Sequence, residues 1–125
     1  MKDITEAKRY ISNAKEILRE KAIKENGVYK DRKYVKMAGH TAYAGVLVAL
    51  DSVLGDKKTK TRKSVEWYQK ELSTTDRKIL SYFLAAYDTL HLAMSYDGNL
   101  SAGVSSEGLQ LADKIIDWAE RRTQA

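Results

Sequence analysis

Two histidines are the side chains in this sequence best suited to acid–base chemistry. His91 lies in the segment AAYDTLHLAMSYDG, where Tyr87 and Asp88 precede it by four and three residues. In a helix, side chains at these spacings can reach an imidazole and orient it. Tyr87, Asp88 and His91 therefore form a candidate polar site. The second histidine, His40, is a further candidate for this site and lies on another predicted helix. The alternative is that both histidines are hydrogen-bonded boundary residues, because no nucleophile stands beside them.

Patterns that bind metals are incomplete in this sequence. There is no cysteine, and neither histidine stands in an ExxH or HExxH motif. Asp97, Asn99 and Ser101 match the start of an EF-hand loop, but Gly103 comes one position late and Gly108 replaces the bidentate glutamate. Glycine-rich phosphate loops and the GxSxG motif are also missing. We predict no metal and no cofactor.

A basic run near the middle of the chain is the second candidate site. The segment 56–63, DKKTKTRK, has five basic residues and one aspartate, a local charge of +4. Trp67 and Tyr68 follow it, and basic side chains mixed with aromatic rings are typical of nucleic-acid surfaces. The alternative is a solvated loop, with Trp67 packed in the core. The candidate contacts to nucleic acid or a partner are Lys57, Lys58, Lys60, Arg62 and Lys63.

The elements that must position these residues are predicted to be helices. Proline, which helix interiors exclude, is absent from all 125 residues. The segment 37–54, MAGHTAYAGVLVALDSVL, is apolar on nearly every side, which predicts a buried central helix. Small residues form one stripe along it, which would let a neighbouring backbone come close. The stripe consists of Ala38, Ala42, Gly45 and Ala49.

Cap and stop residues divide the rest of the chain. Asp3, Asp31, Ser64 and Ser105 are predicted N-terminal caps, the spacing of Ser73 and Asp76 predicts a further helix start, and Gly27 and Gly55 are predicted stops. The predicted helices are 4–26, 32–54, 65–72, 76–96 and one that begins after residue 105. We therefore predict an all-α fold in a single domain, residues 1–125. It is an antiparallel four-helix bundle with a short extra helix in the crossover between the second and third long helices.

Composition and charge narrow the class of protein. Hydrophobic residues make up 43% and charged residues 31%, an ordinary globular balance. The net charge of +5 permits contact with nucleic acid or acidic partners without requiring it. The first residues lack the apolar run of a signal peptide, and the longest apolar run, 46–50, is too short to span a bilayer. We expect a cytoplasmic protein that does not contact a membrane.

Several segments resemble known families. AYAGVLVALDSVL is similar to the second helix of HEPN (higher-eukaryote and prokaryote nucleotide-binding) domains, and LHLAMSYDGNLSAGVSSEGLQLADKIIDWAERR is similar to their final turn and helix. The order of AGHTAYAGVLVALDSVL, WYQKEL and AAYDTLHLAMSYDG more closely resembles an uncharacterised family of small bacterial helical proteins of unknown function. The HEPN resemblance implies a helical bundle that is often dimeric. Many such domains are metal-independent ribonucleases or partners of small nucleotidyltransferases in toxin–antitoxin pairs.

The ribonuclease motif of that family is missing here. It places four to six residues between an arginine and a histidine, whereas seven residues separate Arg32 from His40 and thirteen separate Arg77 from His91. No catalytic residue is therefore carried over. We expect a non-enzymatic HEPN-like protein that binds a protein or RNA partner. The alternative is a ribonuclease or nucleotide-handling enzyme that uses His91 with Asp88 or Tyr87.

A homodimer is also expected, partly because the resemblance implies pairing. Trp67, Tyr68, Tyr82 and Tyr96 do not fall on the predicted core stripes, and tyrosine and tryptophan are favoured at interfaces. On a straight α-helix Tyr82 and Tyr96 lie close in angle, so they would form one flank of a two-fold patch. The alternative is that these rings cover seams of the bundle itself.

Overall fold

The computed structural model is almost entirely helical, and it describes residues 2–55 and 63–124. In chain order its elements are α1 (Lys2–Ile17), the π-helix η1 (Leu18–Ala22), β1 (Lys24–Glu25), β2 (Val28–Tyr29), α2 (Arg32–Leu54), α3 (Val65–Thr75), α4 (Arg77–Ala86), the π-helix η2 (Tyr87–Tyr96) and α5 (Ala102–Thr123). The two strands form one small antiparallel hairpin. The all-α class predicted from the sequence is confirmed, with this hairpin as an addition.

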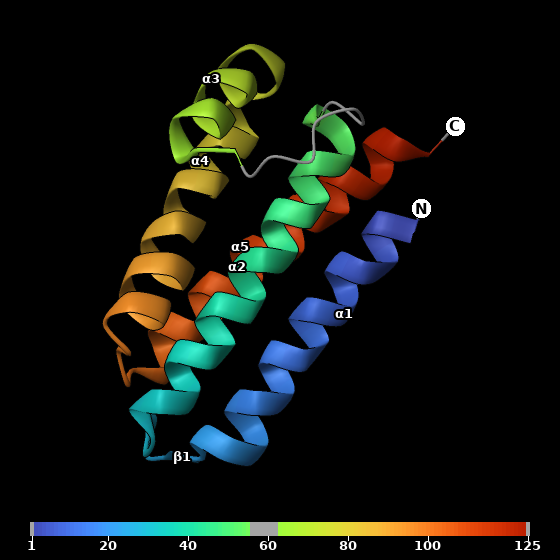
Figure 1. The fold of residues 1–125 in the computed structure, drawn as a ribbon. Coiled ribbons are helices and arrows are strands. Elements are labelled where there is room, and N and C mark those ends of the chain that lie inside the picture. Colours follow the sequence, from blue (N-terminus) through green and yellow to red (C-terminus); the bar gives the residue numbers. More distant parts are fainter. Residues whose placement is uncertain (1, 56–62, 125) are drawn as a thin grey trace.

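The helix α2 lies in the middle of the molecule (Figure 1). It packs against α1 on one side, against η2 on another and against α5, while α4 and η2 also pack on α5. α1 and α2 run antiparallel and are joined by the hairpin, which lies at one end of the molecule. The short helix α3 packs on α4 near the opposite end.

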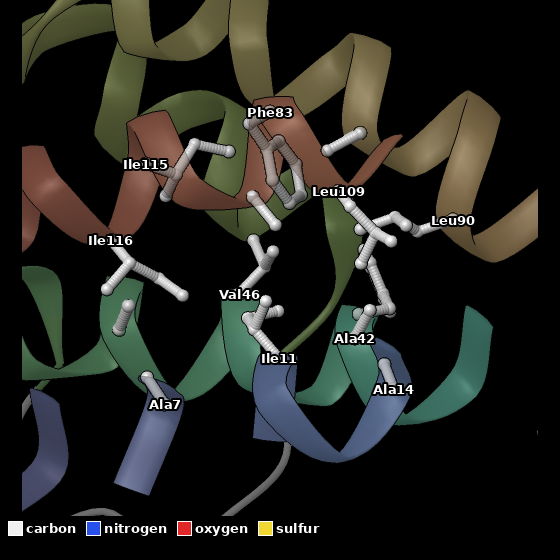
Figure 2. Packing of buried hydrophobic residues seen from close by; sticks show 14 of the residues in the cluster. Ala7, Ile11, Ala14, Ala42, Val46, Phe83, Leu90, Leu109, Ile115 and Ile116 are labelled. Carbon is white, nitrogen blue, oxygen red and sulfur yellow. The ribbon is translucent and has the colours of Figure 1, made fainter. Parts of the chain in front are cut away.

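The predicted stripe of small residues in α2 is buried, and it brings α1 close. A Cβ atom on Gly45 would lie 2.9 Å from Cβ of Tyr10 and 3.1 Å from the carbonyl oxygen of Ala7. Figure 2 shows Ala7 and Ala14 of α1 beside α2, below the larger core side chains. The buried residues of the stripe are Ala38, Ala42, Gly45 and Ala49.

By length and apolar composition alone, α2 could cross a membrane. Its apolar residues are largely used inside the protein, however, since Val35, Val46 and Leu50 are fully buried. Figure 2 shows Val46 pointing into the cluster that contains Phe83. Packing against α1, η2 and α5 thus accounts for the apolar character of α2.

The first predicted helix is wrong over its last residues. Ile23 has a φ of 56°, which ends the helical run, and Asn26 and Gly27 have φ values of 53° and 78°. The hairpin pairs Lys24 with Tyr29. Positive φ at both central residues fits a type I′ turn, for which Asn-Gly is a preferred pair. Asn-Gly therefore forms the hairpin turn, and Gly27 does not act as a helix stop.

Two predicted caps are confirmed by their hydrogen bonds. The carboxylate of Asp31 accepts from the amide of Lys33 at 3.0 Å. The hydroxyl of Ser64 accepts from the amide of Trp67 at 3.1 Å. These side chains satisfy amides that have no partner inside the helix. The starts of α2 and α3 are therefore predicted correctly from the sequence.

The predicted helix start at Ser73 is wrong. α3 does not end at residue 72 but continues to Thr75, so Ser73 lies inside it. The cap of α4 is Asp76, whose carboxylate accepts from the amide of Ile79 at 3.1 Å.

The predicted caps at the two ends of the chain are wrong. Asp3 lies inside α1, which begins at Lys2. The cap of the last helix lies four residues before the predicted cap Ser105, because the hydroxyl of Ser101 accepts from the amide of Val104 at 3.4 Å. The side chain of Asn99 accepts from the amide of Ser101 at 2.9 Å, and this local turn makes Ser101 the cap.

The ends of the helix predicted over 76–96 are nearly correct, but the observed helix changes its hydrogen-bonding pattern partway along. Its second part, η2, is a π-helix of ten residues. A π-helical hydrogen bond spans five residues, so each turn holds more residues than an α-helical turn and the faces shift. η2 approaches α2 at Gly39, where a Cβ atom would lie 2.6 Å from Cβ of Met94. This second close approach was not predicted from the sequence.

Candidate functional site

His91 lies between two tyrosine rings. Its ring centroid is 4.9 Å from that of Tyr43 and 5.1 Å from that of Tyr87, and the two tyrosine centroids are 6.0 Å apart. The structure therefore brings together two of the predicted residues, Tyr87 and His91. It adds Tyr43 from α2, which sequence reasoning assigned only to packing. Helical spacing within one segment cannot reveal a partner that arrives from another helix.

Asp88 and His40 are exposed, and neither side chain makes a hydrogen bond or ion pair with another residue in the described part of the chain. Residues three apart share a face in an α-helix, but the wider π-helical turn moves Asp88 away from His91. Tyr87 is four residues from His91 and stays beside it. The polar cluster in the structure, which we call the His91 cluster, is therefore Tyr43, Tyr87 and His91.

A polar network joins the end of α2 to the start of α3. The hydroxyl of Tyr68, a residue that is 3% exposed, donates to Oδ1 of Asp51 at 2.7 Å. Nζ of Lys63 lies 3.7 Å from the same oxygen and 5.1 Å from the ring centroid of Trp67. Tyr68 thus belongs to the core, which corrects its assignment to an interface. A buried tyrosine usually anchors its hydroxyl in this way.

The candidate nucleic-acid run is described only at its end. Lys57, Lys58, Lys60 and Arg62 lie outside the described residues. The side chain of Lys63 is only 13% exposed because it packs between Asp51 and Trp67. Lys63 therefore acts as a structural contact at the start of α3.

The two tyrosines expected to flank a dimer interface lie in different helical segments. Tyr82 of α4 packs beneath Lys78 and Lys114, whose Nζ atoms lie 5.9 Å and 5.2 Å from its ring centroid. Tyr96, at the end of η2, is 74% exposed. The prediction that Tyr82 and Tyr96 lie close in angle assumed α-helical turns throughout. Because η2 has π-helical turns, that prediction no longer follows from their spacing.

The structure forms a pocket that sequence reasoning missed. We call it the hairpin pocket; it has a volume of about 390 Å³ and is lined by Lys15, Leu18, Arg19, Ile23, Lys24, Tyr29 and Leu109. Leu18 and Leu109 are buried and form an apolar floor, whereas the three basic residues are exposed. A smaller pocket of about 230 Å³ adjoins it and shares Lys15, Lys24, Tyr29 and Leu109.

Parts of the chain that are far apart in sequence build the hairpin pocket. Lys24 and Tyr29 are paired across the hairpin, so their side chains leave the same face of the ribbon. The amide of Tyr29 donates to the carbonyl of Leu100 at 2.8 Å, and the amide of Ala102 donates to that of Gly27 at 2.9 Å. These bonds fix the hairpin against the start of α5. The Asn-Gly turn was a visible signal for the hairpin, but nothing local indicated this docking.

The hairpin pocket carries positive charge that is weakly compensated. Nζ of Lys15 lies 3.4 Å from Asp113, and Nη2 of Arg19 lies 3.6 Å from Glu20, but these side chains are about half exposed or more. Exposed ion pairs of this kind contribute little free energy. Lys24 has no ion pair with another residue of the described segments. An incoming anion therefore meets cations that are free or easily exchanged.

The phenol of Tyr29 adds a neutral hydrogen-bonding group to the same pocket. Burial raises the pKa of Tyr29 above its ordinary value, because a phenolate would be poorly solvated there. Near neutral pH the hydroxyl keeps its proton and can donate it in a hydrogen bond.

A third pocket, between α1 and α5, differs from the hairpin pocket in charge. It has a volume of about 280 Å³ and is lined by Lys8, Ile11, Ser12, Lys15, Asp113, Ile116 and Asp117. Its two lysines face two aspartates, whereas no acidic residue lines the hairpin pocket. None of these three pockets in the described part of the chain is lined by a member of the His91 cluster.

These features define a small helical protein with a basic pocket at its hairpin end. The profile of the family described as "Domain of unknown function (DUF5618)" matches residues 2–121, so the chain belongs to that family. Among solved structures it is similar to a protein of unknown function from Dyadobacter fermentans, with 53% identity over 98% of this chain and 97% of that chain and a TM-score of 0.90. A comparison with curated proteins gave no match.

The comparisons confirm the expected resemblance to a family of small helical proteins of unknown function. They do not name a HEPN domain.

Proposed function

We propose that this protein is a non-enzymatic binding protein and that the hairpin pocket holds an anionic group of its ligand or partner. The observation that supports this is the set of Lys15, Arg19 and Lys24 around a pocket without an acidic lining residue. A volume of about 390 Å³ lies within the usual range for small-ligand sites. A protein partner would offer a carboxylate to this pocket, and an RNA partner a phosphate.

The test is a titration of isotope-labelled protein with sodium phosphate at constant ionic strength, followed through the amide chemical shifts. We expect shifts to concentrate around residues 15–29 and at the start of α5, because these segments surround the hairpin pocket. Lys24→Gln should weaken the response several-fold. Lys70→Gln, an exposed change on α3, is the matched control. Shifts that are absent, or that survive Lys24→Gln unchanged, would contradict the proposal.

The proposal also includes an antiparallel four-helix bundle of the HEPN-like kind, a cytoplasmic location and a homodimer. The position of α2 between α1 and η2, with α5 packed on all three, supports the bundle. The 74% exposure of Tyr96 supports an interface on η2. Light scattering at micromolar concentration tests the dimer, since a mass near 14.2 kDa would rule it out. If the mass is doubled, Tyr96→Glu should restore the monomer.

A second candidate function is favoured by η2 itself. π-Helical segments are rare and occur frequently at functional sites, and both Tyr87 and His91 lie in this one. Tyr87 and His91 would then act in a ribonuclease or a nucleotide-handling enzyme, and the basic run 56–63 would bind its substrate. Incubation with mixed RNA tests this: cleavage that His91→Asn abolishes would support the enzyme. An intact RNA after incubation with the wild-type protein would remove it.

A further inference from the structure

Ile23, on the edge of the hairpin pocket, has a backbone conformation that is unusual for its residue type. Its φ and ψ are 56° and 113°. The other residues with positive φ in this turn are Asn26 and Gly27, the types that tolerate such values. A β-branched residue at positive φ is an outlier, and such strain tends to collect at ligand sites.

The side chain of Ile23 gains little from its own protein. It is 49% exposed, although it is a large apolar group. Glycine, which has no Cβ atom, would be less strained at this φ. Packing within the described chain therefore does not explain an isoleucine here. An apolar surface that covers it from outside would explain it, because burial of that side chain would then offset the strain.

The surroundings of Ile23 divide into an apolar part and a charged part. Leu18 and Leu109, which are 3% and 8% exposed, form the floor beside Ile23. Lys15, Arg19 and Lys24 stand at the edge of the same pocket. A ligand that satisfies both parts must carry an anion and an apolar group close together.

We propose that the hairpin pocket binds an amphipathic anion: a carboxylate or phosphate monoester joined to a short alkyl chain or a single aromatic ring. This inference rests on the proposed function and adds the chemical class of the ligand. The head group contacts Lys15, Arg19 and Lys24, and the phenol of Tyr29 donates to it. The apolar part lies on the floor and beneath Ile23. The pocket volume of about 390 Å³ equals roughly thirteen water molecules in the liquid, which suits a ligand of this size.

The experiment compares ethyl, butyl, hexyl and octyl phosphate with inorganic phosphate by calorimetric titration at constant ionic strength. Each buried methylene should raise the affinity about two- to fourfold until the pocket is filled. Hexanol, which has the chain without the charge, should bind at least about tenfold more weakly than hexyl phosphate, since it lacks the charge-assisted bonds.

Variants of the two parts separate the contributions. Ile23→Asn introduces a residue type that tolerates positive φ and removes the apolar side chain. It should retain inorganic phosphate binding and lose most of the gain with chain length. Lys24→Gln should weaken every phosphate by a similar factor while the gain per methylene remains. Lys70→Gln is again the control. Circular dichroism checks that each variant is folded.

The outcomes distinguish the two levels of the proposal. If inorganic phosphate and the alkyl phosphates bind equally well at this pocket, the amphipathic ligand is overturned and the anion-binding function stands. If no phosphate binds there, both fail. Vesicles of phosphatidylcholine with and without phosphatidylglycerol then identify the source of the ligand. Binding to the anionic vesicles that Lys24→Gln abolishes indicates a lipid; binding of the soluble phosphates alone indicates a free metabolite.

Discussion

The His91 cluster and the hairpin pocket are built in opposite ways. The first gathers side chains with obvious chemical potential, Tyr43, Tyr87 and His91, in ring contact where two helices pack. The second gathers lysines, an arginine and leucines, which have no catalytic signature, around an open space. Reactive side chains act on a ligand only where a ligand has access to them, and none of the three pockets described above is lined by this cluster. Ordinary side chains placed around a pocket provide that access.

The largest effect should come from filling the close approach beside the His91 cluster. Gly39→Ala would place a Cβ atom 2.6 Å from Cβ of Met94 and 2.7 Å from the carbonyl oxygen of Leu90, so η2 must move away from α2. Overpacking of this kind costs about 1–3 kcal/mol of unfolding free energy. Thermal and urea unfolding measure it.

The control for this change is Gly103→Ala. The nearest atom to a Cβ there would be the Ser101 hydroxyl oxygen at 3.5 Å, an ordinary contact, so the stability should stay within about 0.5 kcal/mol of wild type. If Gly39→Ala and Gly103→Ala unfold at the same temperature, the helices beside the His91 cluster are not tightly packed. The contrast between a tightly packed cluster and an open pocket would then lose its basis.

A smaller effect, of opposite sign, is expected at the start of α5, next to the hairpin. The hydroxyl oxygen of Ser105 is buried and makes no hydrogen bond within the described structure. Burying such a group without a partner costs roughly 1–3 kcal/mol, so Ser105→Ala should raise the unfolding free energy by about 1 kcal/mol. The exposed Ser106→Ala is the matched control and should change little. If Ser105→Ala is less stable than the wild type, the Ser105 hydroxyl has a hydrogen-bond partner in solution. The hairpin end of the molecule would then be more polar than the comparison with the His91 cluster assumes.

The smallest effect concerns pH and Tyr29 in the hairpin pocket. Because burial raises the pKa of Tyr29, the folded state keeps the phenolic proton at a pH where the unfolded chain has lost it. The stability this group contributes is therefore full below about pH 10 and falls as the pH rises through the higher folded value. Tyr29→Phe should show a shallower fall in urea stability across that range. Equal slopes would indicate that Tyr29 is as solvated as in the unfolded chain, and the pocket would be more open than described.

The sequence was most informative where one local signal acted alone. Asp31 and Ser64 each stand before a clear helical pattern, and both are caps. It misled where two local signals compete, as when Gly27 fits both a helix stop and an Asn-Gly turn. Two serines four residues apart compete in the same way before α5, and the side chain of Asn99 decides between them.

The candidate sites depended on information that local patterns do not contain. Tyr87 and His91 are predictable as neighbours because a spacing of four residues survives the change from α- to π-helix. Asp88 cannot be predicted as a neighbour of His91 in the same way, because the wider π-helical turn separates residues that are three positions apart. The hairpin pocket needs the docking of residues 28–29 onto the start of α5, which is set by backbone hydrogen bonds between segments some seventy residues apart.

The two glycines of α2 have a consequence for the order in which the molecule opens. Gly45 and Gly39 hold α2 against α1 and η2 at backbone distance, so no part of α2 near them can exchange its amide hydrogens without parting two helices. Exchange there should require global unfolding. The hairpin, with two-residue strands and Ile23 half exposed, should exchange through local opening. Ligand binding at the hairpin pocket would then slow the exchange of the hairpin amides and leave those of α2 unchanged.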